Sequence, residues 1–332
     1  MVASVNLTGK SDTSLELVRE NRLCKEIVFA DGIGSSGKGM LSHILGSLTR
    51  IEKQSNHTPF DYIAYIHWLG KISDDAAITY LRTEADQQLY HIMMSRDVNF
   101  RPKDSTGVMQ NANRWRYFAR LFMREGDAVL DRIYRDRPIL NEAPHDALRN
   151  AKLFFDAFGE ELSFIYIIRD PYELILDWQR RGFGERIGTD PREFQFSVNI
   201  GETIVPMFMM NYEGFDYEKM TALERLTLMI HFCVQTNFEG YLNCSKHQQS
   251  KIKILTFDQL CTDTENMVEE VGTFLGVEKT KATRRILKQE RLPRVRPKRD
   301  HFRSKVVDQL DDRLSTFIED LDNLYQQFKA LS

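Results

Sequence analysis

The sequence predicts a three-layer α/β fold with a mainly parallel central sheet, helices on both faces and helical insertions. Three short, mainly apolar runs lead to this prediction, and each is followed by a turn and an amphipathic stretch. They occupy residues 27–30, 164–168 and 253–257. Buried strands of parallel sheets show such nearly continuous apolar runs. Strands that alternate with helices along a chain form parallel sheets covered on both faces.

The remaining elements follow from helical spacing of apolar residues and from short buried runs bounded by turn residues. Further strands are predicted at residues 128–131 and 138–141. Helices are predicted at residues 40–48, 74–94, 147–158, 171–181, 267–275 and 306–331, and residues 182–250 are predicted to be mainly helical with loops. Gly276 suits the end of one helix and Pro171 the first turn of another.

Composition and charge limit the function classes. The chain has 332 residues, of which 42% are hydrophobic and 28% charged, and this composition is typical of a globular protein rather than a disordered one. The formal net charge of -3 gives no field that attracts nucleic acid or an anionic membrane, so neither is expected as a partner. We interpret residues 1–24 as a flexible lead-in and residues 25–332 as one domain. The sequence does not indicate an oligomeric state.

The four cysteines indicate a reducing compartment. Cys24, Cys233, Cys244 and Cys261 form no Cys-x-x-Cys pair, and no histidine pair stands at zinc spacing, so we expect no metal site. Free thiols are typical of cytoplasmic proteins. Residues 1–22 lack the apolar core of a signal peptide, and no segment reaches the roughly 20 apolar residues that span a bilayer. We therefore expect a cytoplasmic protein without a membrane segment.

A glycine-rich loop follows the first predicted strand. Residues 32–39, GIGSSGKG, fit G-x-x-x-x-G-K between a strand and a helix, which is the context of a phosphate-binding loop. Glycines let successive backbone N–H groups face one anion, the helix N-terminus adds partial positive charge, and Lys38 adds a full charge. The loop predicts a P-loop NTPase-like fold that binds a nucleotide-type donor. The predicted donor-binding residues of this segment are Gly32, Gly34, Ser35, Ser36, Gly37, Lys38, Gly39 and Met40.

The residue after the loop lysine bears on the choice of donor. Magnesium-dependent ATPases keep Ser or Thr there, whereas this chain has Gly39 followed by Met40. A donor that needs no metal fits better, although some nucleotide kinases also carry Gly-Lys-Gly. Asp131, at the end of the strand predicted at residues 128–131, resembles the acceptor-binding Asp-Arg pair of P-loop kinases, with a surface ion pair as the alternative. An ATP- and Mg²⁺-dependent small-molecule kinase is therefore the alternative function.

A second anion-binding position is predicted where the strand at residues 164–168 ends. Arg169 follows this strand directly, and ligands of open α/β sheets bind at this edge. Its fork of N–H donors suits a phosphate group. A surface ion pair with Asp170 or Glu173 is the alternative, and the Arg-Asp-Pro sequence alone does not decide between the two.

These motifs resemble those of the sulfotransferase family that uses 3′-phosphoadenosine-5′-phosphosulfate as donor. Besides the loop, FIYIIRDPYELILDW at residues 164–178 resembles the 3′-phosphate motif of that family, and KILTFDQLCTDTENMVEEVGTFLGV at residues 253–277 resembles its late strand–loop–helix segment. The resemblance spans residues 26–305. It implies that the loop holds the 5′-phosphosulfate and Arg169 the 3′-phosphate. It also implies in-line transfer of a sulfuryl group to a hydroxyl or amine without a metal.

The resemblance also suggests a general base. Residues 141–144, NEAP, resemble the stretch that carries the base of the family. Glu142 stands where cytosolic members keep a histidine, so Glu142 is the first candidate and His145 the second. A carboxylate at the start of a helix, stabilised by the helix dipole, is the alternative role for Glu142.

Two positions depart from the family pattern. Asp177 stands where the family usually has a serine that helps to bind the 3′-phosphate. Either a basic partner neutralises this carboxylate or the donor lacks a 3′-phosphate. At the position of Ser35 the family usually has Lys or Arg, whereas here the lysine stands where kinases keep it. These departures favour two alternatives, the kinase and a binding homologue without catalysis.

A basic segment near the chain end is the second candidate for the 3′-phosphate. Residues 291–303 contain six arginines and lysines against Asp300. The resemblance implies a basic loop over the 3′-phosphate, for which Arg294 and Arg296 are the candidates, and a solvated charged loop is the alternative. Trp178 is the aromatic residue expected nearest this site, whereas most other aromatic residues are expected in the core.

We therefore predict a sulfotransferase in which Lys38, Glu142 and His145 are catalytic. The acceptor is a hydroxyl of a small molecule or carbohydrate. Residues 50–125 and 182–250 are expected to shape its pocket, but their sequence does not indicate which acceptor they bind.

Overall fold

A parallel sheet of four strands lies at the centre of the structure, a computed structural model that describes residues 15–55, 58–104, 106–193, 195–309 and 312–332. Its strand order is β2–β1–β3–β6, and every pairing is parallel. The strands are β1 (Ile27–Asp31), β2 (Leu140–Glu142), β3 (Leu162–Ile168) and β6 (Ile252–Thr256). The predicted α/β fold with a parallel sheet is thus confirmed. The carboxyl ends of all four strands meet at one edge.

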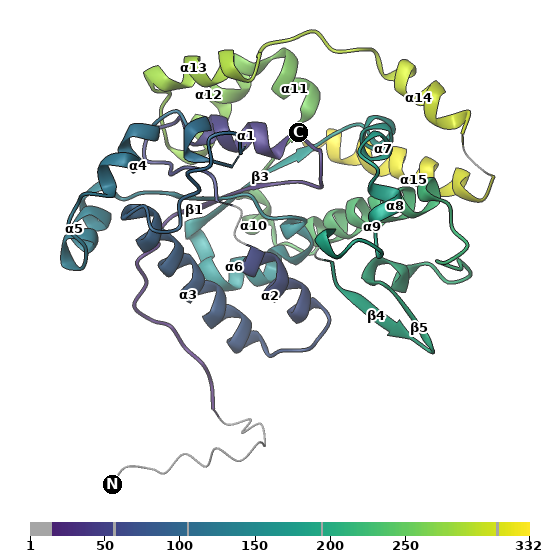
Figure 1. Cartoon of the computed structure of the whole chain (residues 1–332), viewed down its shortest axis with the longest axis horizontal. Helices are drawn as coiled ribbons and strands as arrows, with labels where there is room; N and C mark the ends of the chain where they lie inside the picture. Colours follow the sequence, from purple (N-terminus) through teal and green to yellow (C-terminus); the bar gives the residue numbers. More distant parts are fainter. Residues whose placement is uncertain (1–14, 56–57, 105, 194, 310–311) are drawn as a thin grey trace.

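Helices cover both faces of this sheet. Phe29 and Phe164 contribute to a core under one face, whereas Val28 and Ile165 contribute to a core under the other, as the alternation of side chains in strands requires. The first face is covered by α2 (Thr58–Trp68), α3 (Asp74–Met93) and α6 (Ala151–Phe158). The second is covered by α1 (Lys38–Leu45), α11 (Phe257–Thr262), α12 (Thr264–Leu275) and α13 (Lys281–Gln289). The two groups lie below and above the sheet in Figure 1.

A third group of helices extends the molecule beyond the sheet (Figure 1). It has its own apolar core, which includes Trp178, Phe232 and Leu321. Its members are α7 (Pro171–Arg180), α8 (Phe183–Arg186), α9 (Ala222–Leu242), α14 (Arg299–Val307) and α15 (Asp312–Lys329). The remaining α-helices are α4 (Arg114–Arg120), α5 (Asp127–Asp136) and α10 (Lys246–Ser250). Short 3₁₀ turns occur at Val108–Gln110, Ala147–Asn150, Gly159–Glu161, Pro191–Glu193 and Met207–Asn211.

An antiparallel hairpin projects from the third group of helices (Figure 1). It consists of β4 (Ser197–Ile200) and β5 (Thr203–Pro206) and was not predicted from the sequence. Gly201, with φ of 64°, begins the two-residue turn between the strands, where a positive φ is needed to match the twist of a tight hairpin. The hairpin matters for function because the residues at its base face a cavity.

Most elements predicted from the sequence are present, and two are corrected. The strand predicted at residues 128–131 is wrong, because this segment belongs to helix α5. Val129 and Ile133 are its buried residues, and this i, i+4 spacing is helical. The single helix predicted at residues 306–331 is two helices, because α14 ends at Val307 and α15 begins at Asp312. The two helices pack mainly against different partners, α14 on α7 and α15 on α9.

Part of the predicted lead-in can be described. Residues 1–14 of it lie outside the described residues. Within residues 15–24, the backbone N–H groups of Leu23 and Cys24 both donate to Asp86 Oδ1 on α3, at 2.7 and 2.8 Å. All four cysteines are buried and unpaired. In the described ranges, no helix combines the length and apolar character that a membrane crossing needs.

Candidate functional site

The glycine-rich loop connects β1 to α1 as the sequence predicts. Gly32 has φ of 144° and Gly37 has φ of 109°, values that side chains rarely allow. A Cβ atom at Gly32 would lie 2.6 Å from the Ile167 carbonyl oxygen, and one at Gly37 would lie 2.6 Å from the Phe257 ring. Both glycines are therefore required by backbone conformation and by close packing. The helix begins at Lys38, so its N-terminal N–H groups face the inside of the loop.

Lys38 is buried at the bottom of this loop. Its Nζ donates to the carbonyl oxygen of Pro144, the residue two positions beyond β2, at 2.6 Å. Burial lowers the pKa of Lys38, while the carboxylates of Asp31 and Asp146 oppose that shift. Burial raises the pKa of Asp31 to about 6, although Lys38 opposes it. The loop thus contains a lysine and an aspartate whose charges depend on each other.

The loop also contains a buried polar atom suited to an incoming ligand. Ser36 Oγ is buried and has no hydrogen-bond partner within the described part of the chain. Such groups are rare in folded proteins because their desolvation is costly. By contrast, a Cβ at Gly39 would meet nothing within 4 Å. The position where kinases keep a magnesium-binding hydroxyl is therefore open.

Arg169 and Arg296 lie next to each other beside the loop, because both contact the Glu173 carboxylate and the Phe257 ring. Arg169 Nη2 donates to Glu173 Oε1 at 2.6 Å, and Arg296 pairs with the other oxygen of Glu173. Both guanidinium carbons lie 4.4 Å from the centre of the Phe257 ring. Arg169 Nη1 also donates to the Ser35 carbonyl at 2.6 Å. Residues following β1, β3 and β6, together with the basic segment, thus meet at one place.

Arg294 lies at the edge of this group. Its backbone N–H donates to the Cys261 carbonyl at 2.7 Å, and its guanidinium carbon lies 5.8 Å from the centre of the Phe257 ring. Arg169 Nε is buried without a hydrogen-bond partner among the residues described. The cluster therefore retains an unused donor for an anion.

Asp177 is neutralised by basic partners. It pairs with Arg180 and, at 2.8 Å, with Arg181. Although burial raises its pKa, hydrogen bonds from Arg180 and Ser35 hold the pKa of Asp177 below its ordinary value. The side chain that departs from the family pattern is thus compensated locally rather than left to repel an anion.

A cavity of about 350 Å³ opens next to the loop. It reaches Gly34 and Trp178, and the Trp178 indole N–H donates to the Gly34 carbonyl at 2.9 Å. Most of its other lining residues come from four regions, which are α2, the segment after β2, the base of the hairpin, and α9, and Phe183 is added by α8. They include Asp61, Tyr62, Tyr65, His145, Asp146, Arg149, Glu193, Gln195, Phe196, Met207, Phe208 and Phe232. These regions partly coincide with residues 50–125 and 182–250, where the sequence predicts the acceptor pocket.

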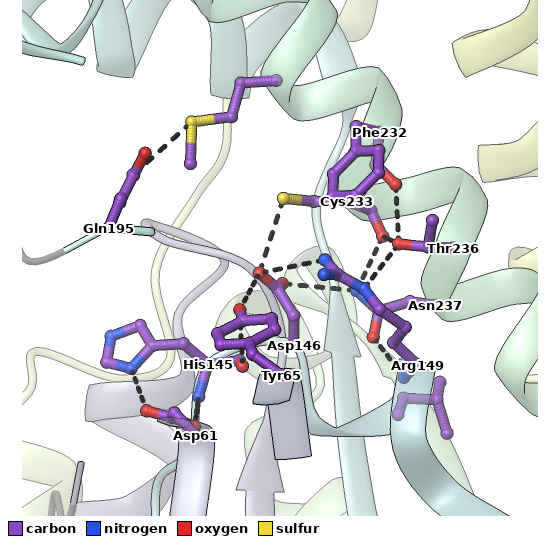
Figure 2. Close-up of polar contacts among 12 residues, drawn as sticks. Asp61, Tyr65, His145, Asp146, Arg149, Gln195, Phe232, Cys233, Thr236 and Asn237 are labelled. Carbon is purple, nitrogen blue, oxygen red and sulfur yellow. Dashed lines mark hydrogen bonds and ion pairs between the residues drawn. The ribbon is translucent and has the colours of Figure 1, made fainter. Parts of the chain in front are cut away.

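His145 and Asp61 form a hydrogen-bonded pair on the wall of this cavity (Figure 2). Asp61 Oδ2 lies 3.2 Å from His145 Nδ1, and Asp61 Oδ1 accepts the His145 backbone N–H at 2.8 Å. Asp61 is buried on α2, whereas the His145 side chain is about half exposed. If Nδ1 carries the proton toward Asp61, Nε2 is free to accept another proton.

Glu142 occupies a different position from His145. It lies within β2, is 1% exposed and pairs in register with Phe29. Its charge acts on Lys53, and it is not among the described residues that line the cavity. Of the two candidate bases, His145 is therefore the one that reaches the space beside the loop.

A buried polar network forms the floor of the cavity (Figure 2). Arg149 Nε donates to Thr236 Oγ1 at 2.9 Å, and Arg149 lies 3.8 Å from Asp146. Asp146 also accepts hydrogen bonds from Asn237 at 3.3 Å and from Cys233 at 3.4 Å. Sequence patterns did not indicate this network, because its two groups of residues, at 146–149 and 233–237, lie far apart along the chain.

Asp131 and Asp170, the carboxylates considered for the alternative kinase function, are not among the described residues that line the cavity. Asp131 is exposed on α5. Asp170 caps α7 by accepting from the Tyr172 and Glu173 N–H groups and pairs with Arg299. Within the described ranges, no group of three or more His, Cys, Asp or Glu side chains is arranged to hold a metal ion.

The fold and site define an α/β protein with a glycine-rich loop between β1 and α1 and an adjacent cavity that carries a histidine. Its structure is similar to solved sulfotransferase domains. The sulfotransferase domain from the curacin biosynthetic pathway matches 79% of this chain and 77% of its own, at 11% identity and a TM-score of 0.44. The sulfotransferase domain from the Synechococcus PCC 7002 olefin synthase matches 95% of this chain and 90% of its own, at 12% identity and a TM-score of 0.44.

A sulfotransferase from Alicyclobacillus acidocaldarius matches 90% of this chain and 96% of its own, at 12% identity and a TM-score of 0.41. No family model matches the chain, and no curated protein sequence matches it. Likenesses with such low identities and TM-scores carry no conclusion about activity. The proposed function therefore rests on the residues of the site.

Proposed function

We propose that this chain is a sulfotransferase that moves the sulfuryl group of 3′-phosphoadenosine-5′-phosphosulfate to a hydroxyl of an acceptor in the cavity. One observation supports this proposal above the others. A phosphate loop and a histidine–aspartate pair border the same 350 Å³ cavity. A donor and an acceptor bound on either side would meet there, as group transfer requires.

The residues around the loop fit the two anionic ends of this donor. In the proposal, the loop N–H groups and Lys38 hold the 5′-phosphosulfate, and Ser36 Oγ gains the partner that it lacks. Arg169 and Arg296 bind the 3′-phosphate, for which Arg169 Nε is still unused. Glu173 keeps the two guanidinium groups together before the donor arrives. Preorganised donors of this kind stabilise developing charge without reorganisation.

In the proposed reaction, His145 acts as the general base and Asp61 as a positioning residue. The acceptor oxygen attacks sulfur and forms a new S–O bond, while its proton passes to His145 Nε2. The bond between sulfur and the bridging phosphate oxygen breaks, and adenosine 3′,5′-bisphosphate leaves. Lys38 offsets the negative charge on the leaving side. Asp61 holds the ring and the backbone of His145 with its two oxygens, so the base is oriented before the acceptor binds.

Thermal unfolding with added nucleotides tests the donor assignment. Adenosine 3′,5′-bisphosphate at about 100 times its Kd should stabilise the protein by about 2.7 kcal/mol without any metal. Stabilisation by ATP that requires Mg²⁺, with no effect of the bisphosphate, would overturn the proposal in favour of a kinase.

An assay of sulfated product separates catalysis from binding alone. Incubation with the phosphosulfate donor and a panel of small hydroxyl compounds should yield sulfated product by mass spectrometry. Binding of the bisphosphate without product from any acceptor would instead identify a binding homologue. The buried, unpaired cysteines favour a reducing compartment such as the cytoplasm as the place of this activity.

A further inference from the structure

We infer that the cavity selects ring-bearing acceptors that carry no negative charge. This inference rests on the proposed function, because it concerns the acceptor side of the same site. It follows from the aromatic wall, from the charges on that wall and from an ion pair at its edge.

Aromatic side chains make up much of the wall. Tyr62 and Tyr65 come from α2, Phe196 and Phe208 from the two ends of the hairpin, and Phe232 from α9. The Phe196 ring centre lies 5.4 Å from that of Tyr62 and 6.3 Å from that of Tyr65. Aromatic faces bury a large contact area against a flat ligand. A cavity of about 350 Å³ suits a ring with short substituents.

The charged groups on the wall are mostly acidic. Asp61, Asp146 and Glu193 contribute three carboxylates, whereas Arg149 contributes the one guanidinium among the described lining residues. Asp61 is engaged by the neighbouring imidazole and Asp146 by Arg149. With Arg186 counted, which pairs with Glu193, three carboxylates stand against two guanidinium groups, so the wall keeps an excess of one negative charge. In the proposed complex, the anionic donor adds further negative charge next to Gly34.

Arg149 is poorly placed to bind an anionic acceptor. Its side chain is 2% exposed. Its guanidinium carbon lies 5.1 Å from the centre of the Tyr65 ring, 5.6 Å from that of Trp68 and 4.6 Å from that of Phe232. One nitrogen, Nη1, has no hydrogen-bond partner within the described residues, but it is also buried. An acceptor anion would have to displace aromatic rings to reach it.

Glu193 neutralises the cation nearest the cavity edge. Arg186 Nε lies 2.8 Å from Glu193 Oε1, and its guanidinium carbon lies 4.8 Å from the centre of the Phe183 ring. Phe183 and Glu193 both line the cavity. Without the Glu193 charge, Arg186 would lose the carboxylate that it contacts directly, and among the described residues Asp190 would still act on its charge without a direct contact. Glu193 is thus a specificity-determining residue for acceptor charge.

An anionic acceptor therefore binds poorly for two reasons. It loses the water that solvates its charge and gains no exposed cation in return. It also approaches carboxylates in a space where the effective dielectric constant is far below that of water. A neutral or cationic acceptor of the same shape avoids both costs.

Three acceptors of nearly equal shape provide the test. They are 3-(4-hydroxyphenyl)propanamide, tyramine and 3-(4-hydroxyphenyl)propanoate, which are neutral, cationic and anionic at pH 7.5. Two methylene groups insulate the charge from the ring, so the reactivity of the hydroxyl stays nearly constant. We expect kcat/KM for the anion to be at least about 30-fold below that for the neutral phenol. Calorimetric titration of each compound into the bisphosphate-bound protein gives the same comparison without turnover.

A pair of variants assigns the effect to the cavity edge. Glu193→Gln should raise kcat/KM for the anionic acceptor at least fivefold relative to the neutral one, because Arg186 loses its paired carboxylate. Glu202→Gln makes the same charge change in the hairpin turn, where the residue is exposed and does not belong to the cavity lining. It should leave the ratio unchanged.

The outcomes separate this inference from the proposed function. Sulfation of all three acceptors with equal kcat/KM would overturn the charge selection while leaving the sulfotransferase in place. Charge-selective binding without transfer would support the cavity assignment and reject the activity. If none of the three compounds binds to the bisphosphate-bound protein, the cavity does not take ring-bearing acceptors and the inference fails.

Discussion

Replacing Lys38 by methionine tests the donor side of the site most directly. In the proposed reaction, the Lys38 ammonium group stands next to the sulfuryl group and its leaving oxygen. A unit charge about 4 Å away contributes about 4 kcal/mol at an effective dielectric constant of 20. Removal of a preorganised donor from a transition state typically costs about 2.7–4 kcal/mol. We therefore expect kcat/KM to fall about 100- to 1,000-fold.

Stability should change much less than activity. Methionine matches the length of lysine and removes a buried charge, whose burial already lowers the pKa of Lys38. The Pro144 carbonyl loses its donor at 2.6 Å, at a cost of about 1–3 kcal/mol, and the buried Asp31 loses a cation. Because these terms oppose each other, the free energy of unfolding should change by about 2 kcal/mol or less.

Lys53 offers a matched control. It is also buried, donates to a backbone carbonyl at 2.6 Å and has its pKa lowered to about 8 by burial. Unlike Lys38, it lies outside the glycine-rich loop at residues 32–39. Steady-state kinetics and thermal unfolding of Lys38→Met and Lys53→Met should show a large loss of activity in the first variant alone. If Lys38→Met retains kcat/KM within about twofold, roughly 0.4 kcal/mol, Lys38 does not act on the transferred group.

Four further variants test the base, the 3′-phosphate site and the pH dependence of folding. His145→Gln should lower kcat at least about 100-fold while bisphosphate affinity is retained, whereas Glu142→Gln should keep kcat within about fivefold; the reverse order in product assays would assign the base to Glu142. Arg169→Gln should weaken adenosine 3′,5′-bisphosphate binding at least about tenfold and leave adenosine 5′-monophosphate binding nearly unchanged in calorimetry. Equal losses for both ligands would contradict a 3′-phosphate role. Because burial raises the pKa of Asp31 to about 6 in the folded state, the folded protein binds the extra proton, and stability should fall as pH rises from about 4 to 6. Asp31→Asn should remove this slope in urea titrations and add up to about 3 kcal/mol at pH 7.5, and an unchanged slope would show that another group causes it.

The donor half of the site could be predicted from the sequence because its parts are local. Each of its motifs is a strand followed directly by a turn, and parallel strands bring their carboxyl ends to one edge. The loop at residues 32–39, Arg169 and the basic residue Arg296 therefore lie together as expected. Phe257, which joins the two arginines, was read as the last residue of a strand. The contact of Phe257 with both arginines becomes visible only when β1, β3 and β6 are placed side by side in the sheet.

The acceptor half could not be predicted in the same way. Asp61, Arg149 and Phe232 lie on helices where their spacing is indistinguishable from core positions. The hairpin was missed because its strands are mostly exposed, with Ile200 and Ile204 both open to solvent, so no buried apolar run indicates it. The strand predicted at residues 128–131 failed for the opposite reason, because a short apolar run also fits one buried turn of a helix.

The position of His145 connects the two halves of the site. It follows β2 by three residues, and the Pro144 carbonyl beside it accepts the hydrogen bond of Lys38. Asp61 reaches it from α2 on the opposite side. A shift of the segment after β2 would therefore move the base and the lysine contact together. In the proposed reaction, occupation of the loop and alignment of the base would therefore be coupled through one short stretch of backbone, which would help to hold donor and acceptor in line.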